Sequence, residues 1–237
     1  MNINPLLLSK RGIKIDYDVD ALTPDEERII ETLYSVDLEN YNSLLRASEE
    51  LRDIDPSIVV NCIAAHWNID SVLDGMQNIE KVFRTKVKLN NLIKRYFEDS
   101  RHWHFYKYNS DWLDQFNDRS NASITVDDIA RNVDIDFIIN SRACGPGIDG
   151  FFSFVIENGG DPYIVIRKIA ARIDCLSNID VEDIVFWITP YLEPGDIDME
   201  KLFSRIDWDT VKRSNYMDIY EDFFKRLAPE LVSKIPS

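Results

Sequence analysis

Glycine and cysteine are both scarce in this chain. Only 8 of its 237 residues are glycine, which is about half the usual share. Nucleotide-binding α/β folds and turn-rich β folds use many glycines, so this scarcity disfavours both classes. The three cysteines, Cys62, Cys144 and Cys175, form an odd set without paired spacing. We therefore expect free thiols, as in a reducing cytoplasm, rather than a disulfide framework.

Long apolar runs are also missing. A strongly apolar run such as residues 151–156 is far shorter than a membrane-spanning helix. Residues 1–10 have no charged region before their short apolar run, so we expect no signal peptide. Together with the thiols, these features predict a cytoplasmic protein without a membrane partner.

Basic residues are outnumbered. The chain has 42 acidic and 27 basic residues, which gives a formal net charge of -15. The summed field would repel phosphate groups, so we expect no direct binding to nucleic acid and no docking on anionic membranes.

What the chain does contain is aspartate that follows an apolar residue. Aspartate is a poor residue inside a helix and a good N-cap, because its carboxylate accepts a free backbone N–H. In six of seven such positions, the residue four places after the aspartate is apolar, as in a hydrophobic staple. The seven positions are Asp37, Asp55, Asp70, Asp134, Asp180, Asp198 and Asp207, of which only Asp70 lacks the apolar residue. Thr23 and Thr125 open capping-box sequences, and Asp161 precedes a proline.

The segments that follow these caps have helical periodicity over about three turns each. We therefore predict an all-α fold of about ten to twelve short helices, packed as irregular helical hairpins. Residues 13–19 alternate and could form one short strand or hairpin near the N-terminus. The spacing of the aspartate starts has no fixed period, so no regular solenoid is expected.

Charge and polarity divide the chain into two lobes. We expect an N-terminal helical lobe over residues 1–108, a polar connection over 109–123 and an acidic helical lobe over 124–237. The two lobes could equally form one continuous domain. The N-terminal lobe ends in a segment that mixes bases with aromatic residues. This segment could bind single-stranded nucleic acid or an acidic partner, but we favour an amphipathic helix whose bases meet the acidic lobes. Its candidate contact residues are Lys94, Arg95, Arg101, Trp103, Tyr106 and Lys107.

A GxGxxG pattern occurs at Gly145, Gly147 and Gly150. Dinucleotide binding by this pattern requires a preceding strand, whereas residues 134–142 are expected to be helical, so we predict an interhelical loop. Cys144 beside this loop could be a nucleophile only with a histidine base nearby, and it is more simply a small buried residue.

Complete metal and catalytic sets are not found in the sequence. His102 and His104 lack a third ligand for zinc. Paired acids such as Asp127 and Asp128 lie at predicted helix starts, where the helix dipole explains them. We therefore expect no catalytic residues, no metal and no cofactor.

The leading functional hypothesis is a non-catalytic acidic interaction protein. It would bind a basic, nucleic-acid-handling protein through carboxylate-rich surfaces, as inhibitors, immunity proteins and anti-defence proteins do. One alternative is a helical scaffold that binds through an apolar groove, with Trp103, Trp112, Trp187, Tyr191 and Trp208 as candidate exposed aromatics. A second alternative is a metal-dependent hydrolase of unfamiliar type that uses clustered aspartates. The expected partner-binding residues are Asp180, Glu182, Asp183, Glu193, Asp196, Asp198, Asp207, Asp209 and Trp208.

Overall fold

The computed structural model describes residues 22–97, 112–140 and 147–236. These residues form helices, short 3₁₀ and π segments and connecting loops, without a β-strand among them. The prediction of an all-α fold is therefore confirmed. The possible strand at residues 13–19 lies outside the described residues. The described residues form two compact units, one of residues 22–96 and 112–124, and one of residues 97, 125–140 and 147–236.

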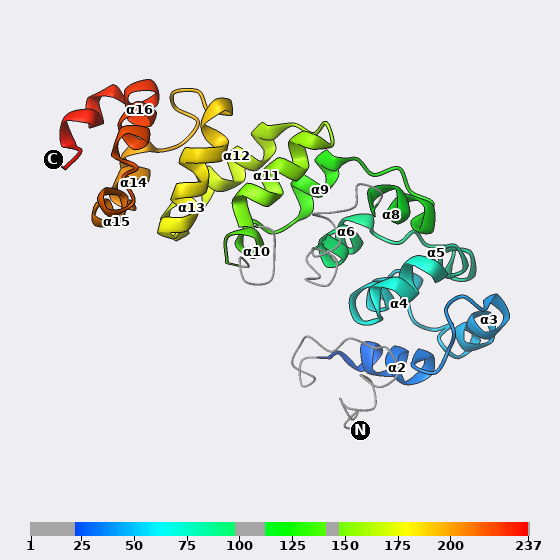
Figure 1. The fold of residues 1–237 in the computed structure, drawn as a ribbon. Helices are drawn as coiled ribbons and strands as arrows, with labels where there is room; N and C mark the ends of the chain where they lie inside the picture. Colours follow the sequence, from blue (N-terminus) through cyan, green and yellow to red (C-terminus); the bar gives the residue numbers. More distant parts are fainter. Residues whose placement is uncertain (1–21, 98–111, 141–146, 237) are drawn as a thin grey trace. The chain divides into compact units, whose positions relative to one another are not determined.

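The N-terminal unit is organised around its longest helix (Figure 1). This helix, α5, contacts α3, α4 and α8, and α2 packs on α3 and α4. The approach of α5 to the loop before α3 is close, since a Cβ added to Gly75 would lie 2.6 Å from the Cβ of Leu38. The helices are α2 (Pro24–Leu33), α3 (Tyr41–Glu50), α4 (Pro56–His66), α5 (Ile69–Phe83), α6 (Leu89–Phe97) and α8 (Trp112–Ser120).

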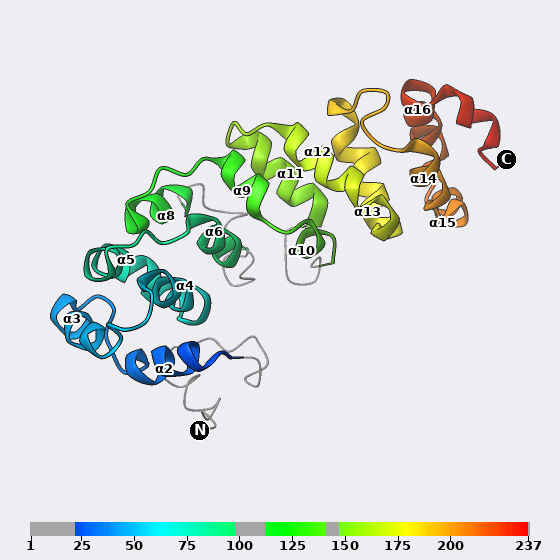
Figure 2. The same ribbon diagram turned by 180° about the vertical axis from the view of Figure 1, so that it is seen from behind.

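The C-terminal unit is built from helices that mostly contact their neighbours in sequence (Figures 1 and 2). Its most apolar helix, α11, packs against α9, α10, α12 and α13 and buries Phe151, Phe152 and Val155. The α-helices are α9 (Val126–Asn132), α10 (Ile135–Asn140), α11 (Gly147–Glu157), α12 (Pro162–Ala171), α13 (Asn178–Asp183), α14 (Met199–Ser204), α15 (Trp208–Arg213) and α16 (Met217–Leu227). The other segments are η2 (Ile173–Cys175), the π-helical η3 (Ile184–Ile188), η4 (Thr189–Tyr191) and η5 (Pro229–Lys234).

Aspartate caps several helices as expected. The carboxylates of Asp55, Asp161, Asp198 and Asp207 each accept a backbone N–H in the first turn of the following helix. Both capping boxes, at Thr23 and Thr125, are present with their reciprocal hydrogen bonds. These starts therefore follow directly from local hydrogen-bond chemistry.

Three other helix starts differ from the prediction. Asn40 rather than Asp37 caps α3, and Asn68 rather than Asp70 caps α5. Ser177 caps α13, and Asp180 is the third helical residue, where its carboxylate accepts the backbone N–H and the hydroxyl of Ser177. Serine and asparagine are as good N-caps as aspartate, and in each case the residue that fits the turn geometry takes the position.

Candidate functional site

The acidic surface of the C-terminal unit is concentrated in one stretch of chain. Residues 174–209 contain ten acidic residues and two basic ones. Both bases bind within the unit: Lys201 Nζ lies 3.3 Å from Asp174 Oδ2, and Arg205 donates two hydrogen bonds to the Leu176 carbonyl. The remaining carboxylates are therefore poorly neutralised by this stretch itself.

Two of the expected contact residues are buried. Asp180 and Asp183 are each only 3% exposed, and Asp180 stabilises the start of α13 as part of the capping box. The carboxylate of Asp183, together with that of Glu182, adds to burial in raising the pKa of Tyr220. These two aspartates thus act within the fold, and we leave them out of the proposed contact surface.

Three further acids make defined local bonds. Asp198 Oδ1 accepts the backbone N–H of Lys201 at 3.1 Å, and Asp196 Oδ2 accepts that of Glu193 at 2.8 Å. Asp207 accepts the Thr210 hydroxyl at 2.7 Å and the Thr210 amide at 3.1 Å. These bonds hold the pKa of Asp207 below its ordinary value, so its carboxylate stays charged at neutral pH while capping α15.

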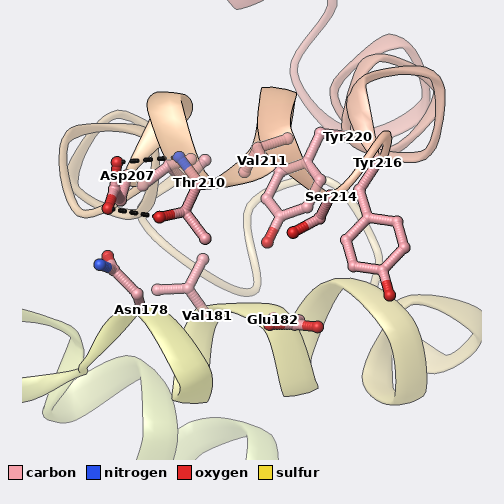
Figure 3. Close-up of a pocket in the computed structure, with 10 residues that line it drawn as sticks. Asn178, Val181, Glu182, Asp207, Thr210, Val211, Ser214, Tyr216 and Tyr220 are labelled. Atoms are coloured by element: carbon pink, nitrogen blue, oxygen red, sulfur yellow. Dashed lines mark hydrogen bonds between the residues drawn. The ribbon is translucent and has the colours of Figure 1, made fainter.

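Glu182 and Asp207 lie on opposite sides of a small hollow between α13 and the helices α15 and α16 (Figure 3). Val181 of α13 and Val211 of α15 line it from opposite sides, and Ser214 and Tyr216 also contribute to the lining. Its volume of about 30 Å³ admits water, whereas ligand pockets usually measure about 300–1,000 Å³. The hollow therefore separates two carboxylates on the surface and does not hold a small organic substrate.

Three acids of this stretch are not neutralised by a base of the described residues. In the part of the chain that the structure describes, no lysine or arginine forms a salt bridge with Glu182, Glu193 or Asp209. Glu193 and Asp209 are exposed and Glu182 is half-buried. They supply charge that is available to another molecule.

Trp187 is the most exposed of the large apolar side chains described, at 57%. It lies in the π turn η3, which directly follows Glu182 and Asp183 at the end of α13. Ile179 in α13 and Tyr191 in η4, on either side of η3, are 46% and 38% exposed. Trp187 entered the sequence-based interpretation only as a candidate for an apolar groove, although the buried positions 181, 184, 185 and 188 leave it on the opposite helical face.

Trp208 is half-buried, and its ring packs against neighbouring aromatic side chains. Its ring lies 4.9 Å from that of Phe203 and 6.0 Å from that of Tyr220, measured between centroids. Of the other candidate aromatics, Trp103 lies outside the described residues, as does the side chain of Trp112.

The basic and aromatic segment is described only in part. Arg95 donates hydrogen bonds to the carbonyl oxygens of Ala64 and Trp67, and thereby satisfies the C-terminal end of α4. Lys94 is exposed on α6, and Tyr96 is buried with its ring 5.2 Å from that of Phe116. The remaining candidates lie outside the described residues: Arg101, Trp103, Tyr106 and Lys107.

Cys144 and the first glycine of the GxGxxG pattern, Gly145, lie outside the described residues. Gly147 and Gly150 are in α11, and the nearest described element before the pattern is helix α10 rather than a strand. Among the described residues, no group of three or more histidine, cysteine, aspartate or glutamate side chains is placed to hold a metal ion. Of the described cysteines, Cys62 is buried, which raises the pKa of its thiol to about 12, and Cys175 is exposed.

Comparisons with protein-family models, with curated proteins and with solved structures found no match to this chain. Within the ranges described, no helix combines the length and the apolar character needed to cross a membrane.

Proposed function

We propose that this protein is a non-catalytic, acidic binding protein that blocks a basic, nucleic-acid-handling protein, as inhibitors, immunity proteins and anti-defence proteins do. The observation that carries the proposal is the exposed Trp187, which lies on an acid-rich stretch whose own two bases are already bound internally. Carboxylates on this surface would compete with phosphate for the partner's cationic groove.

Trp187 gives the proposed surface an anchor in addition to charge. Tryptophan is enriched among the residues that dominate binding energy at protein interfaces. Its ring is also the best aromatic acceptor for a cation, and arginine is the commonest donor. An arginine-rich face would therefore meet both an aromatic ring and unpaired carboxylates such as Glu182 and Asp209.

The test is affinity capture from the native host with mass spectrometry, at about 50 mM and about 500 mM NaCl, because salt screens charge–charge attraction. We expect a basic nucleic-acid-handling protein at low salt and much less of it at high salt. The variants Trp187→Ala and Glu182→Gln/Asp209→Asn should each reduce its capture.

A matched control removes the same kinds of side chain from the N-terminal unit. Leu45, Glu31 and Glu49 are exposed there, so Leu45→Ala/Glu31→Gln/Glu49→Gln should capture the partner as well as the original protein does. If capture is the same at both salt concentrations and with Glu182→Gln/Asp209→Asn, but is lost with Trp187→Ala, the helical scaffold with an apolar groove is favoured instead. A partner without a basic surface would refute the proposal.

A further inference from the structure

The N-terminal unit contains an open hollow of about 350 Å³ beside the C-terminal end of α5. It is lined by the end of α5, by the loop that leads to α6, and by Asn121 after α8. The charged residues of its lining are Lys81, Arg84, Lys86 and Glu80. A surface with more cations than acids is unusual in a chain whose formal net charge is -15.

The single acid of the lining is already engaged. Glu80 Oε2 lies 2.5 Å from Lys86 Nζ, and its other oxygen accepts the backbone N–H of Val87 at 3.1 Å. Lys81 Nζ lies 4.6 Å from the centroid of the Tyr41 ring, a contact that holds the ammonium without cancelling its charge. In the described ranges, no acid forms a salt bridge with Arg84. The hollow therefore keeps an excess of positive charge.

Arg84 occupies a backbone conformation that arginine disfavours. It ends α5 in the left-handed region, with φ 51° and ψ 32°, a position that usually belongs to glycine or asparagine. Asn121, on the hollow's lining, also has a positive φ of 48°. Residues held in this region cluster at functional and ligand-binding segments, so the conformation of Arg84 is an observation in favour of a functional role for its side chain.

The helix dipole explains only part of this charge. The negative end of α5 favours cations in its last turn, where Lys81 lies. Arg84 and Lys86 follow the helix and line the hollow from the connecting loop. The dipole does not account for the conformation of Arg84, nor for the position of Arg84 and Lys86 on the lining beyond the end of the helix.

We propose that this hollow binds a small molecule that carries a diphosphate or triphosphate group. Its volume falls in the usual range for ligand pockets, about 300–1,000 Å³. Guanidinium binds phosphate oxygens in a bidentate manner, and lysine ammonium groups bind them as point charges. Because Glu80 offsets one of the three cations, the lining keeps an excess of two positive charges, which two or more linked phosphates match better than a single phosphate does. This site is independent of the acidic surface of the C-terminal unit.

The experiment measures binding to the full chain by calorimetry and by thermal unfolding. The probes are sodium pyrophosphate, ADP, ATP and inorganic phosphate, with sodium chloride at matched ionic strength. We expect saturable stabilisation by pyrophosphate or the nucleotides, and at least about tenfold weaker binding of inorganic phosphate. Preference for ADP over pyrophosphate would identify a nucleotide, and equal binding would identify the diphosphate group alone as the determinant.

Arg84→Gly is the decisive variant. Glycine accepts the left-handed conformation, so the variant should unfold at an equal or higher temperature without ligand, yet lose the stabilisation by pyrophosphate. Asn215→Gly changes another left-handed residue, with φ 59°, and should keep the response. Lys88→Gln removes an exposed base that does not line the hollow and should also keep it.

The double variant Lys81→Gln/Lys86→Gln provides a second test if Arg84→Gly does not fold, and it should bind pyrophosphate at least about tenfold more weakly. Three results would each overturn the proposal: chloride that stabilises as much as pyrophosphate, binding that does not saturate, or variants of the lining that respond as the original protein does.

Discussion

Asp207 shows how a single carboxylate can serve both the fold and the surface. It caps α15 through Thr210, and these bonds lower the pKa of Asp207. Asp180 has a similar local role but is buried, whereas Asp209 is exposed in the first turn of α15. In the sequence, all three belong to one acidic stretch. Whether each one is buried depends on which face of its helix packs inward, and the residue type alone does not determine that face.

His66 illustrates the opposite case, a titratable side chain inside the N-terminal unit. It ends α4 and is 8% exposed, with its Nε2 atom 3.8 Å from Glu26 Oε1. Burial lowers the pKa of His66, nearby Glu26 partly opposes this effect, and Arg95 reinforces it. The native state therefore holds the neutral imidazole at pH values where the unfolded chain has bound a proton.

This difference predicts that stability depends on pH near neutrality. The unfolded state binds more protons as pH falls through about 6.5, so the free energy of unfolding should fall between pH 7.5 and pH 5.5. His66→Gln cannot gain this charge and should show a smaller fall over the same interval. Urea unfolding of both proteins at the two pH values measures the difference. An equal pH dependence would show that His66 does not carry the effect.

At the scale of an element, the π turn η3 depends on two adjacent residues. The Thr189 N–H closes the π turn on the Ile184 carbonyl. The next donor would be the backbone nitrogen of residue 190, but Pro190 has no N–H. The Thr189 hydroxyl instead donates to the Val185 carbonyl at 2.5 Å. The side chain of Thr189 thus supplies the hydrogen bond that proline removes, directly after the exposed Trp187.

Thr189→Val should therefore destabilise the C-terminal unit. Valine keeps the shape of the threonine side chain but cannot donate a hydrogen bond. The partly buried Val185 carbonyl oxygen then loses this donor, at a cost of about 1–3 kcal/mol. Urea unfolding measures the loss, and Thr189→Ser, which retains the hydroxyl, should recover most of it. Equal stability of the valine and threonine proteins would show that solvent supplies the bond equally well.

The helix starts show what could be predicted at this scale. Asp55, Asp198 and Asp207 were identified because an apolar–aspartate pair with a staple is a strong local signal. The starts at Asn40 and Ser177 were missed because asparagine and serine are common in loops as well as at caps. Helix α5 ends at Arg84 and not at a glycine, so the sequence gives no sign of the left-handed turn there. The basic hollow beside this turn could therefore not be predicted.

At the scale of the whole molecule, the all-α fold followed from composition and periodicity, because scarce glycine and short amphipathic runs leave few other architectures. The grouping of the described helices into two compact units depends on long-range packing, such as α8 against α5. Arg119 of α8 reinforces this packing by binding Asp70 at 2.8 Å and Asp74 at 2.7 Å. Such contacts join residues about 45–49 positions apart, and local sequence patterns do not reveal them.

Net charge provides the last prediction. With a formal charge of -15, the folded chain repels itself more than the expanded unfolded chain does, and salt screens this repulsion. Raising NaCl from about 20 to about 200 mM should therefore stabilise the protein by ~1 kcal/mol, which corresponds to about 2–4 °C in Tm for a chain of this size.

Glu157→Lys/Glu193→Lys alters two exposed acids without ion pairs and changes the net charge to -11. Thermal unfolding of this variant should depend less on salt. A Tm that falls with salt in the original protein would show that surface ion pairs such as Arg28–Asp53 outweigh the general repulsion.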